Sequence, residues 1–380
     1  MALSMPNSAY LLYSITEVEP NGYYFSQFKS MDPICMFGTF DAPIALIHRM
    51  EVERAKQEGR FSKVLDLKLY QERAEKELGA PTLSNAIFLA AKDCGFTNFT
   101  IPHDFPAQLF SDLTQLGIKL EIAKAPLFPQ RAIKSPQEIE QCRTGAAISE
   151  AGFARVKQIL QQSSISADDS LIYEGQTLTC EFLRKEIRVA CTMAGGGQNS
   201  PIAASGPQAA DCHCIGFGPV KAHEMIVVDI FPRDDASYMY GDLSRTFVKG
   251  TPSDKMRDIY DTVYQAHQAA LACFGPGKPL GAVDKAARAV LEQRGYPTRL
   301  REDGLWEGCY CGIGHGVGLE VHEFPFIRET DETMEVGQVI TIEPGLYIPE
   351  VGGCRIEDTI VITKEGYEFI NTPNYDWIIE

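Results

Sequence analysis

The segment with the clearest chemical content is VVDIFPRDDASYMYGDLSRTF, residues 227–247. Apolar residues flank Asp229 and Asp242, which predicts two buried strands and disfavours the alternative of exposed strands with solvated acids. If the two runs form a hairpin that turns at Asp235–Ala236, the two acids lie directly opposite each other on one face. Burying two like charges side by side destabilises a sheet, so this arrangement indicates a divalent cation between them.

Further residues of metal-ligand type follow in the sequence. His315 and His322 lie in GIGHGVGLEVHEFP, whose glycines let the backbone approach a site closely. Glu343 and Glu357 interrupt apolar strand patterns, and Arg355 lies on the same strand face as Glu357. Carboxylates with one imidazole suit a pair of Mn²⁺, Co²⁺, Fe²⁺ or Zn²⁺ ions. Two such ions about 3.5–4 Å apart hold a water as hydroxide and stabilise a tetrahedral intermediate, so the predicted chemistry is hydrolysis.

The elements that would position these residues fall into two parts. Residues 1–130 alternate short strand patterns with helical patterns, which predicts an α/β domain with a largely parallel sheet. Residues 131–380 favour an α+β domain with a mostly antiparallel sheet, and two rounds of helices followed by strands suggest an internal duplication. A capping box at Ser135 and Glu138, with Pro136 between them, predicts the first helix of this part. The other predicted helices are 179–193, 253–273 and 280–294, and the predicted strands are 199–205, 211–217, 225–234, 237–248, 337–348 and 354–363.

Composition narrows the classes of function. The net charge of −16, from 51 acidic and 35 basic residues, argues against a nucleic-acid partner. No apolar run is long enough to cross a membrane, and residues 1–20 lack the basic start of a signal peptide, so we expect a cytoplasmic protein without membrane contact. The eleven cysteines are then expected as reduced thiols. Two C-x-C pairs, 212/214 and 309/311, leave a four-thiolate zinc site as an alternative to ordinary buried thiols.

Four segments together resemble the motifs of one known family. VVDIF…GDLSRTF, GHGVGLEVHE, TIEPG and RIEDT are similar to the motif set of the pita-bread metallopeptidases (family M24), which include methionine aminopeptidase, Xaa-Pro aminopeptidase and Xaa-Pro dipeptidase (prolidase). The segment FPQRAIKSPQEIEQCRTGAA and the upstream domain resemble the proline-specific branch. The resemblance implies a creatinase/prolidase-like α/β domain over residues 1–130. It implies a pita-bread catalytic domain with a curved, mostly antiparallel sheet over residues 131–380.

The resemblance also implies a role for each site residue. The metal ligands would be Asp229, Asp242, His315, Glu343 and Glu357. Asp242 and Glu357 would bridge the two ions, and Glu343 would also act as the general acid/base for the water proton. Catalytic support would come from His322 at the intermediate or substrate, from His213 as the pocket histidine, and from Arg355 beside a ligand or the substrate.

The implied activity is hydrolysis of the bond between an N-terminal residue and proline, by a metal-bridging hydroxide. The enzyme would be an Xaa-Pro aminopeptidase or dipeptidase acting on peptides with proline at the second position. Two divalent ions are implied, with manganese expected and cobalt, zinc or iron as alternatives, and a homodimer is one expected assembly. The other hypotheses are a creatinase-like hydrolase that works without metal and a non-catalytic peptide- or protein-binding module on the same fold.

The sequence departs from the family pattern at four points. The two Asp residues are 13 apart where 11 is usual, and DIFPRD replaces a more usual D-x-G start. Ser244 stands where Thr is common, and Cys311 stands four residues before His315, where the proline-specific branch often has His. These differences leave the choice of substrate open but keep all five ligand types.

Overall fold

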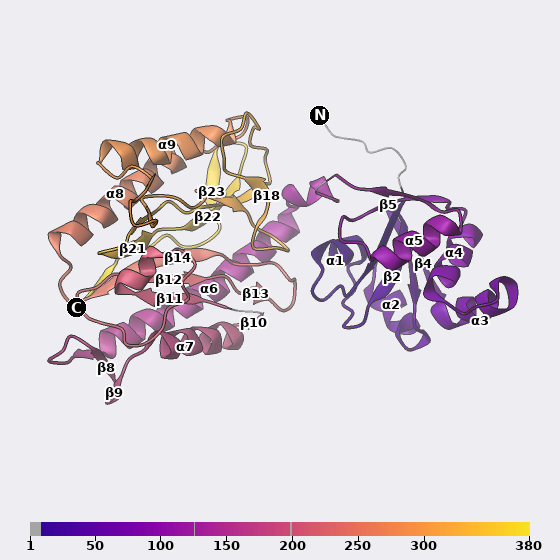
Figure 1. Cartoon of the computed structure of the whole chain (residues 1–380), viewed down its shortest axis with the longest axis horizontal. Coiled ribbons are helices and arrows are strands. Elements are labelled where there is room, and N and C mark those ends of the chain that lie inside the picture. Colours follow the sequence, from indigo (N-terminus) through magenta and orange to yellow (C-terminus); the bar gives the residue numbers. More distant parts are fainter. Residues whose placement is uncertain (1–8, 125, 198–199) are drawn as a thin grey trace. The chain divides into compact units, whose positions relative to one another are not determined.

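A computed structural model of the chain describes residues 9–124, 126–197 and 200–380, so the first residue of the expected strand 199–205 lies outside it. The chain divides into two compact units, Met1–Pro129 and Gln130–Glu380 (Figure 1).

The N-terminal unit contains one six-stranded sheet in the order β4-β3-β2-β1-β5-β6. Its strands are β1 (Tyr10–Ser14), β2 (Ile34–Thr39), β3 (Ala42–Ile47), β4 (Lys63–Asp66), β5 (Asn98–Ile101) and β6 (Lys119–Ile122). Its helices are α1 (Pro20–Ser26), α2 (Val52–Glu58), α3 (Leu67–Leu78), α4 (Leu83–Asp93) and α5 (Ala107–Gln115). Leu11 and Leu12 of β1 enter separate cores, one with α4 and α5 and one with α1 and α2, so both faces of the sheet are buried.

This sheet is more mixed than the sequence predicted. Strands β3–β4, β1–β5 and β5–β6 pair in parallel, but β1–β2 and β2–β3 are antiparallel. The β2–β3 pair is a tight hairpin closed at Phe40–Asp41, between the paired residues Thr39 and Ala42. Such a connection needs only two residues, whereas a parallel pair needs a crossover. The unit is therefore α/β in class, with an antiparallel hairpin at its centre.

The four predicted helices of the C-terminal unit are confirmed within a few residues. They are α6 (Pro136–Gln162), α7 (Cys180–Met193), α8 (Asp254–Leu271) and α9 (Leu280–Gln293). The capping box is confirmed too, because Ser135 Oγ accepts from the Glu138 N–H and the Glu138 carboxylate accepts from the Ser135 N–H. A strong cap fixes a helix start from local sequence alone, which explains the accuracy of this prediction.

Two sheets lie between these helices (Figure 1). The first comprises β11 (Ile202–Ser205), β12 (Ile226–Ile230), β14 (Leu243–Lys249) and β24 (Ile378–Ile379); the second comprises β18 (Glu323–Phe326), β17 (His315–Gly316), β19 (Val339–Ile342), β22 (Asp358–Ile362) and β23 (Tyr367–Phe369). The smaller pieces are β7 (Ser164–Ile165), β8 (Leu171–Tyr173), β9 (Gln176–Thr177), β10 (Gly196–Gly197), β13 (Arg233–Asp234), β15 (Arg299–Leu300), β16 (Trp306–Glu307), β20 (Gly345–Ile348) and β21 (Gly352–Arg355). One core packs α6 and α7 against β12 and β14, and another packs α8 and α9 against β19 and β22. A backbone bridge between Ser244 and Glu357 joins the two sheets.

The hairpin that carries Asp229 and Asp242 has a different register from the predicted one. Asp229 pairs with Ser244, so it does not lie directly opposite Asp242. The Asp234 carboxylate accepts hydrogen bonds from the Ser237 N–H (2.9 Å) and hydroxyl (2.5 Å), and this bonding moves the turn toward residues 235–238. A shift of two residues preserves the side-chain face. The two acids therefore remain on one face as diagonal neighbours.

The strand predicted at residues 211–217 is wrong, because this segment forms turns and irregular structure. It follows a short 3₁₀ helix, Gly206–Ala210, and the Asp211 carboxylate accepts the His213 N–H to form a local turn. Gly216 has a φ of +86°, and a Cβ there would lie 2.0 Å from the Ala203 carbonyl oxygen. Cys212 and His213 consequently lie on a loop that packs closely against β11.

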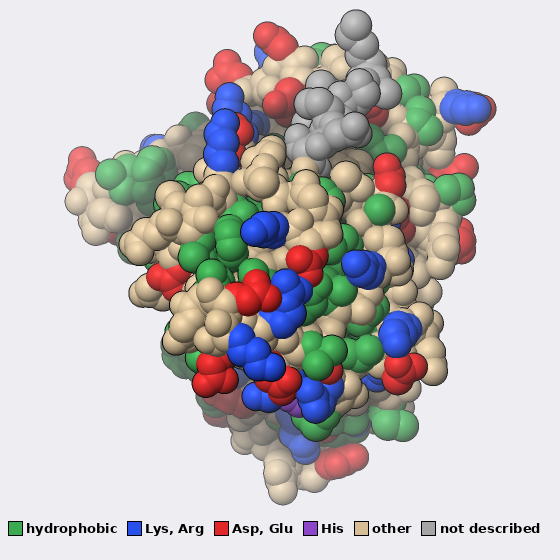
Figure 2. All heavy atoms as spheres, turned by 90° about the vertical axis from the view of Figure 1, so that its right-hand side faces the viewer, with side chains coloured by type: hydrophobic (Ala, Val, Ile, Leu, Met, Phe, Trp, Pro, Cys, Tyr) green, Lys and Arg blue, Asp and Glu red, His purple; other side chains and the backbone are tan. Residues whose placement is uncertain are grey.

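In the part of the chain that the structure describes, no helix combines the length and apolarity needed to cross a membrane. On the face of the molecule in Figure 2, acidic and basic side chains are interspersed. The absence of a nucleic-acid partner stays a prediction.

A buried charge cluster connects the residues before α6 to β18. Glu323 is 7% exposed and accepts from Lys134 Nζ and from Arg131 Nη2, both at 2.6 Å. Burial alone would raise the pKa of Glu323, but the charges of Lys134 and Arg131 outweigh it, and the pKa lies below its ordinary value. Glu323 is thus an ionised carboxylate fixed next to the His322 segment.

Replacing this carboxylate tests its contribution to stability. We expect Glu323→Gln to lower the free energy of unfolding by about 3–5 kcal/mol at pH 7, because the buried Lys134 loses its counter-charge and Arg131 keeps only the more exposed Glu320. The folded pKa is depressed, so the contribution is present above the unfolded value of about 4.3 and disappears as the pH falls through the folded pKa. Urea unfolding followed by tryptophan fluorescence reports this unit alone, since Trp306 and Trp377 are the two tryptophans of the chain.

The control is Glu365→Gln, at an exposed position. It should change stability little at either pH. An equal loss for Glu323→Gln at pH 7 and at pH 3.5 would show that the ion pairs do not supply the difference.

Candidate metal centre

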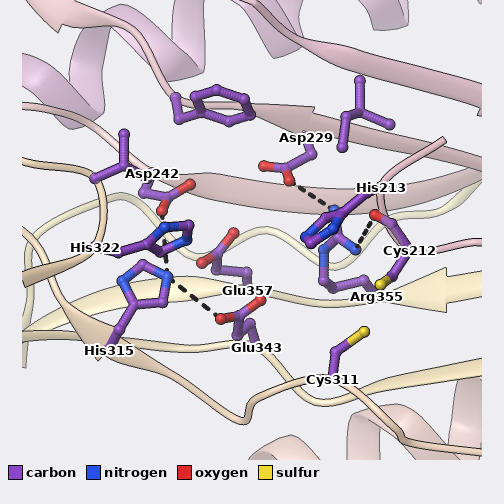
Figure 3. A pocket seen from close by; sticks show the side chains of 13 residues that line it. Cys212, His213, Asp229, Asp242, Cys311, His315, His322, Glu343, Arg355 and Glu357 are labelled. Carbon is purple, nitrogen blue, oxygen red and sulfur yellow. Dashed lines mark hydrogen bonds and ion pairs between the residues drawn. The ribbon is translucent and has the colours of Figure 1, made fainter. Parts of the chain in front are cut away.

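One cavity of about 270 Å³ in the C-terminal unit collects every site residue predicted from the sequence (Figure 3). Its lining includes Asp229, Asp242, His315, Glu343, Glu357, His213, His322 and Arg355. It also includes Ile202, Phe231 and Val321, which the sequence did not assign to a site. Cys212 and Cys311 line it too, although the sequence placed them in a site only under the four-thiolate zinc alternative.

The acidic end of the cavity is a compact group of ligand atoms. Asp242, His315 and Glu357 each offer one ligand atom, and these atoms lie within 4.8 Å of one another. His315 Nε2 is 3.6 Å from Asp242 Oδ2 and 3.3 Å from Glu343 Oε1. Asp242 precedes β14, Glu343 follows β19 and Glu357 precedes β22, so the acids sit at strand ends contributed by both sheets. Among the described residues, no three cysteines bring their sulfur atoms together in a comparable cluster. The structure therefore excludes the four-thiolate zinc alternative.

Glycines and a threonine position His315. A Cβ at Gly314 would lie 2.2 Å from the Thr341 carbonyl oxygen, and one at Gly316 would lie 2.4 Å from the Phe324 carbonyl oxygen. The backbone can therefore approach this closely only without side chains at those two positions. The His315 N–H donates to Thr341 Oγ1 at 3.1 Å, and Nδ1 lies 3.2 Å from the Gly316 carbonyl oxygen. This contact orients Nε2 toward the acids, as in a metal-ligating histidine.

Arg355 compensates the charge of Asp229. Its Nη2 donates to Asp229 Oδ2 at 2.6 Å, and its Nη1 donates to Tyr347 Oη at 2.8 Å. Its Nε donates to Ser244 Oγ at 2.8 Å, so the hydroxyl at the position where Thr is common in the family supports Arg355. Arg355 is 4% exposed and therefore acts within the protein interior.

The remaining charge in the cavity is not balanced by protein groups. Burial, and then the neighbouring acids, raise the pKa values of Asp242 and Glu357 well above the ordinary range. Burial likewise raises the pKa of Asp229 despite Arg355, and Asp229 Oδ1 is a buried atom without a hydrogen-bond partner among the described residues. Burial opposes the protonation of His315, but Glu343 and Asp242 outweigh it and raise its pKa to about 9. These acids and one imidazole form a donor set that fits divalent cations.

Two further histidines face the same cavity. The His322 ring meets His315 edge-on, with centroids 4.3 Å apart. Burial, and then the charge of His315, lower the pKa of His322, so its imidazole is neutral at pH 7. His213 enters from the loop near Arg355 (Figure 3). The cavity therefore has histidines on two sides of the acidic group.

Sequence reasoning missed Tyr347 as part of this arrangement. It pairs through β20 with Gly353 of β21, and its hydroxyl reaches Arg355. A signal was present, because a tyrosine in an otherwise apolar strand needs a partner for its hydroxyl when it is buried. The partner could not be identified before the register of β20 and β21 was known.

A group of buried carboxylates clustered around one imidazole, open to a cavity, is the arrangement of a metal-dependent hydrolase. Comparison with known proteins gives the family: residues 140–364 match the model for metallopeptidase family M24. The chain belongs to this family, and it is a peptidase whose catalytic unit has the pita-bread fold. The family implies divalent metal ions.

Individual relatives cover nearly the whole chain. The chain is 29% identical over 356 residues to the Xaa-Pro dipeptidase of Pyrococcus furiosus, covering 91% of this chain and 89% of that protein. The crystal structure of X-Pro aminopeptidase from Thermotoga maritima superposes with a TM-score of 0.80 at 22% identity, covering 98% of this chain and 97% of the other. The prolidase from Pyrococcus horikoshii superposes with a TM-score of 0.78 at 25% identity, covering 97% and 95%.

The role of Arg355 can be tested by comparing two substitutions. In metal-free protein we expect Arg355→Met to lower the free energy of unfolding by about 3–5 kcal/mol, because Asp229 loses its counter-charge in the interior. Tyr347→Phe should cost only about 1–1.5 kcal/mol, since it removes one hydrogen bond and keeps the ring. Urea unfolding at pH 7 measures both. Equal losses would contradict charge compensation as the function of Arg355.

Proposed function

We propose that the protein hydrolyses the peptide bond between an N-terminal residue and a following proline, using two divalent metal ions. The observation that carries the proposal is the convergence of Asp229, Asp242, His315, Glu343 and Glu357 on one cavity. The names of the relatives, Xaa-Pro dipeptidase and X-Pro aminopeptidase, supply the substrate class.

All five convergent residues would hold the ions, with Asp242 and Glu357 shared between them. When bound, the ions lower the pKa of a water molecule and polarise the substrate carbonyl. Manganese is our first choice because the donor set is rich in oxygen, and cobalt, zinc and iron are the alternatives.

Four protein side chains would carry out proton transfer, stabilisation of the developing charge, substrate contact and positioning of Asp229. Glu343 lies next to the cluster, 3.3 Å from His315, where its second function would be to accept the proton of the attacking water and return it to the leaving nitrogen. His322 is neutral and can donate a hydrogen bond to the oxygen on which charge develops. His213 would contact the substrate, and Arg355 would act as a positioning residue by holding Asp229.

The apolar part of the lining supports a prolyl substrate. Ile202, Phe231 and Val321 provide hydrophobic contacts in the same cavity. An Xaa-Pro bond has no N–H to satisfy, and the ring fixes φ, so shape and apolar contact can recognise it. Phe231 stands in the DIFPRD variant of the usual start, where its side chain contributes directly to this lining.

Two other hypotheses use the same fold. A creatinase-like hydrolase would work without metal, and a binding module would not catalyse a reaction. The unbalanced acids and the orphaned Asp229 Oδ1 favour bound cations over both. Cytoplasmic location and a homodimer stay predictions.

Metal dependence and substrate choice provide the first test. Protein stripped with a chelator should be inactive and should regain hydrolysis of Ala-Pro or Ala-Pro-Ala with Mn²⁺, Co²⁺, Zn²⁺ or Fe²⁺. Metal should also raise the melting temperature, since a ligand at 100 times its Kd adds about 2.7 kcal/mol of stability. Elemental analysis of the purified protein identifies the metal that it carries.

The Asp229→Asn variant separates the hypotheses. It should lose both metal-induced stabilisation and activity under our proposal. Activity that persists without metal would favour the creatinase-like reaction, and partner binding without any hydrolysis would favour a binding module. Cleavage of Met-Ala peptides but not of prolyl peptides would refute the substrate class.

The proton-transfer role of Glu343 has a separate test. Glu343→Gln keeps an oxygen near the cluster but cannot accept a proton, so kcat should fall by about 10²–10⁴-fold while KM changes little. Metal content is measured in parallel, and Glu329→Gln at an exposed position is the matched control. A fall in kcat that merely follows lost metal would assign Glu343 to metal binding alone.

A further inference from the structure

The end of the cavity near Arg355 holds a pair of thiols that the proposed reaction does not use. Cys212 lies on the loop after the 3₁₀ helix Gly206–Ala210, and Cys311 lies before β17. Both thiols line the cavity, and the interaction between them is the largest cause of the pKa shift of each. Figure 3 shows the two sulfur atoms on the same side of Arg355. Two segments far apart in the sequence thus present adjacent thiols to one space.

The backbone around the pair is already held in place. The Tyr310 hydroxyl donates to the Ala210 carbonyl oxygen at 2.6 Å, so it connects the two cysteine-bearing segments directly. Arg288 donates to the carbonyl oxygens of Cys309 (2.7 Å) and Cys311 (3.2 Å). A bond between the sulfur atoms would therefore join segments that are neighbours before it forms, which limits the entropy lost on closure.

The two thiols differ in reactivity. The hydrogen bond from Cys311, with the nearby His213 and Arg355, lowers the pKa of Cys212 to about 6 against the opposing effect of burial. The same hydrogen bond, followed by burial, raises the pKa of Cys311. Cys212 lies beside His213 and within hydrogen-bonding distance of Arg355 through its carbonyl oxygen, so it is the thiol better placed to react as a thiolate, with Cys311 placed to resolve the product. By contrast, burial raises the pKa of Cys35 and Cys354, which keeps those thiols protonated.

We propose that Cys212 and Cys311 form a reversible disulfide on exposure to hydrogen peroxide and that this bond slows peptide hydrolysis. The inhibitory part rests on the proposed function. The Cys212 thiolate attacks one peroxide oxygen, the O–O bond breaks, and after protonation the products are Cys212 sulfenic acid and water. The Cys311 sulfur then attacks the Cys212 sulfur, and its proton leaves with the departing hydroxyl as a second water. Two thiols are oxidised and one peroxide is reduced to two waters.

The two cysteines are connected to the candidate metal centre through few intervening residues. Arg355 Nη1 donates to the Cys212 carbonyl oxygen at 3.3 Å, and Arg355 Nη2 holds Asp229. On the other side, Cys311 lies four residues before His315. A bond that draws the two sulfurs together therefore acts on segments that position Asp229, His213 and His315. Displacements of about 1 Å at such groups are enough to reduce turnover by up to about 100-fold.

The test treats metal-loaded protein with hydrogen peroxide, removes the oxidant, and maps peptides without reduction. We expect one cross-linked species containing Cys212 and Cys311, lighter by two hydrogen atoms. Hydrolysis of Ala-Pro should fall by roughly tenfold or more and return after dithiothreitol. Free thiols at both positions after treatment would overturn the proposal, and so would a cross-link that leaves turnover unchanged.

Three variants make the assignment specific. Cys311→Ser should leave Cys212 as a sulfenic acid that dimedone traps, and Cys212→Ser should leave Cys311 unmodified. Cys214→Ser is the matched control from the same loop, because Cys214 does not line the cavity, and it should form the cross-link like the wild type. A dimedone adduct on Cys311 in Cys212→Ser would contradict the assigned nucleophile.

The mass measurement does not depend on any substrate. If the protein proves inactive on prolyl peptides, a Cys212–Cys311 cross-link still confirms the thiol chemistry while the proposed function fails. If prolyl peptides are hydrolysed and no cross-link forms, the redox inference alone fails.

Discussion

The accumulation of four largely buried carboxylates around one imidazole is the constraint on which the C-terminal unit depends. Asp242 and Glu357 are 4% and 2% exposed, and the side chains of Asp229 and Glu343 are 14% and 19% exposed. Such a group would repel itself without cations. Arg355 compensates part of the charge of Asp229 through Oδ2, and the four acids with His315 form a donor set that fits divalent metal. The same need explains the glycines around His315, which bring the imidazole to the acids.

Both sheets of the C-terminal unit contribute residues to this centre. Asp229 and Asp242 come from the strands packed under α6 and α7, whereas His315, Glu343 and Glu357 come from those packed under α8 and α9. The bridge between Ser244 and Glu357 aligns the two groups, and the Arg355 side chain connects the same segments through Ser244 and Asp229. The relative position of these candidate ligands therefore depends on contacts between the two sheets, which local sequence does not determine.

This division explains what the sequence could and could not predict. Helix α6 was predictable because its cap is made by Ser135 and Glu138, three residues apart. The residues that line the cavity were recognisable as candidates because acids and histidines stood within apolar or glycine-rich patterns. The register of the Asp229 hairpin could not be predicted, because the Asp234 side chain fixes the position of the turn through hydrogen bonds from Ser237. The partner of the Tyr347 hydroxyl and the proximity of Cys212 to Cys311 depend on long-range packing, which the local sequence does not specify.

The distribution of the ligands along the chain has a consequence for synthesis on the ribosome. An emerging chain that includes Asp229 and Asp242 but stops before His315 has two of the five ligand-type residues and lacks Arg355 as well. Only after residue 357 has left the exit tunnel can all the acids meet. The full set of ligand-type residues is therefore assembled only after both halves of the C-terminal unit have been made.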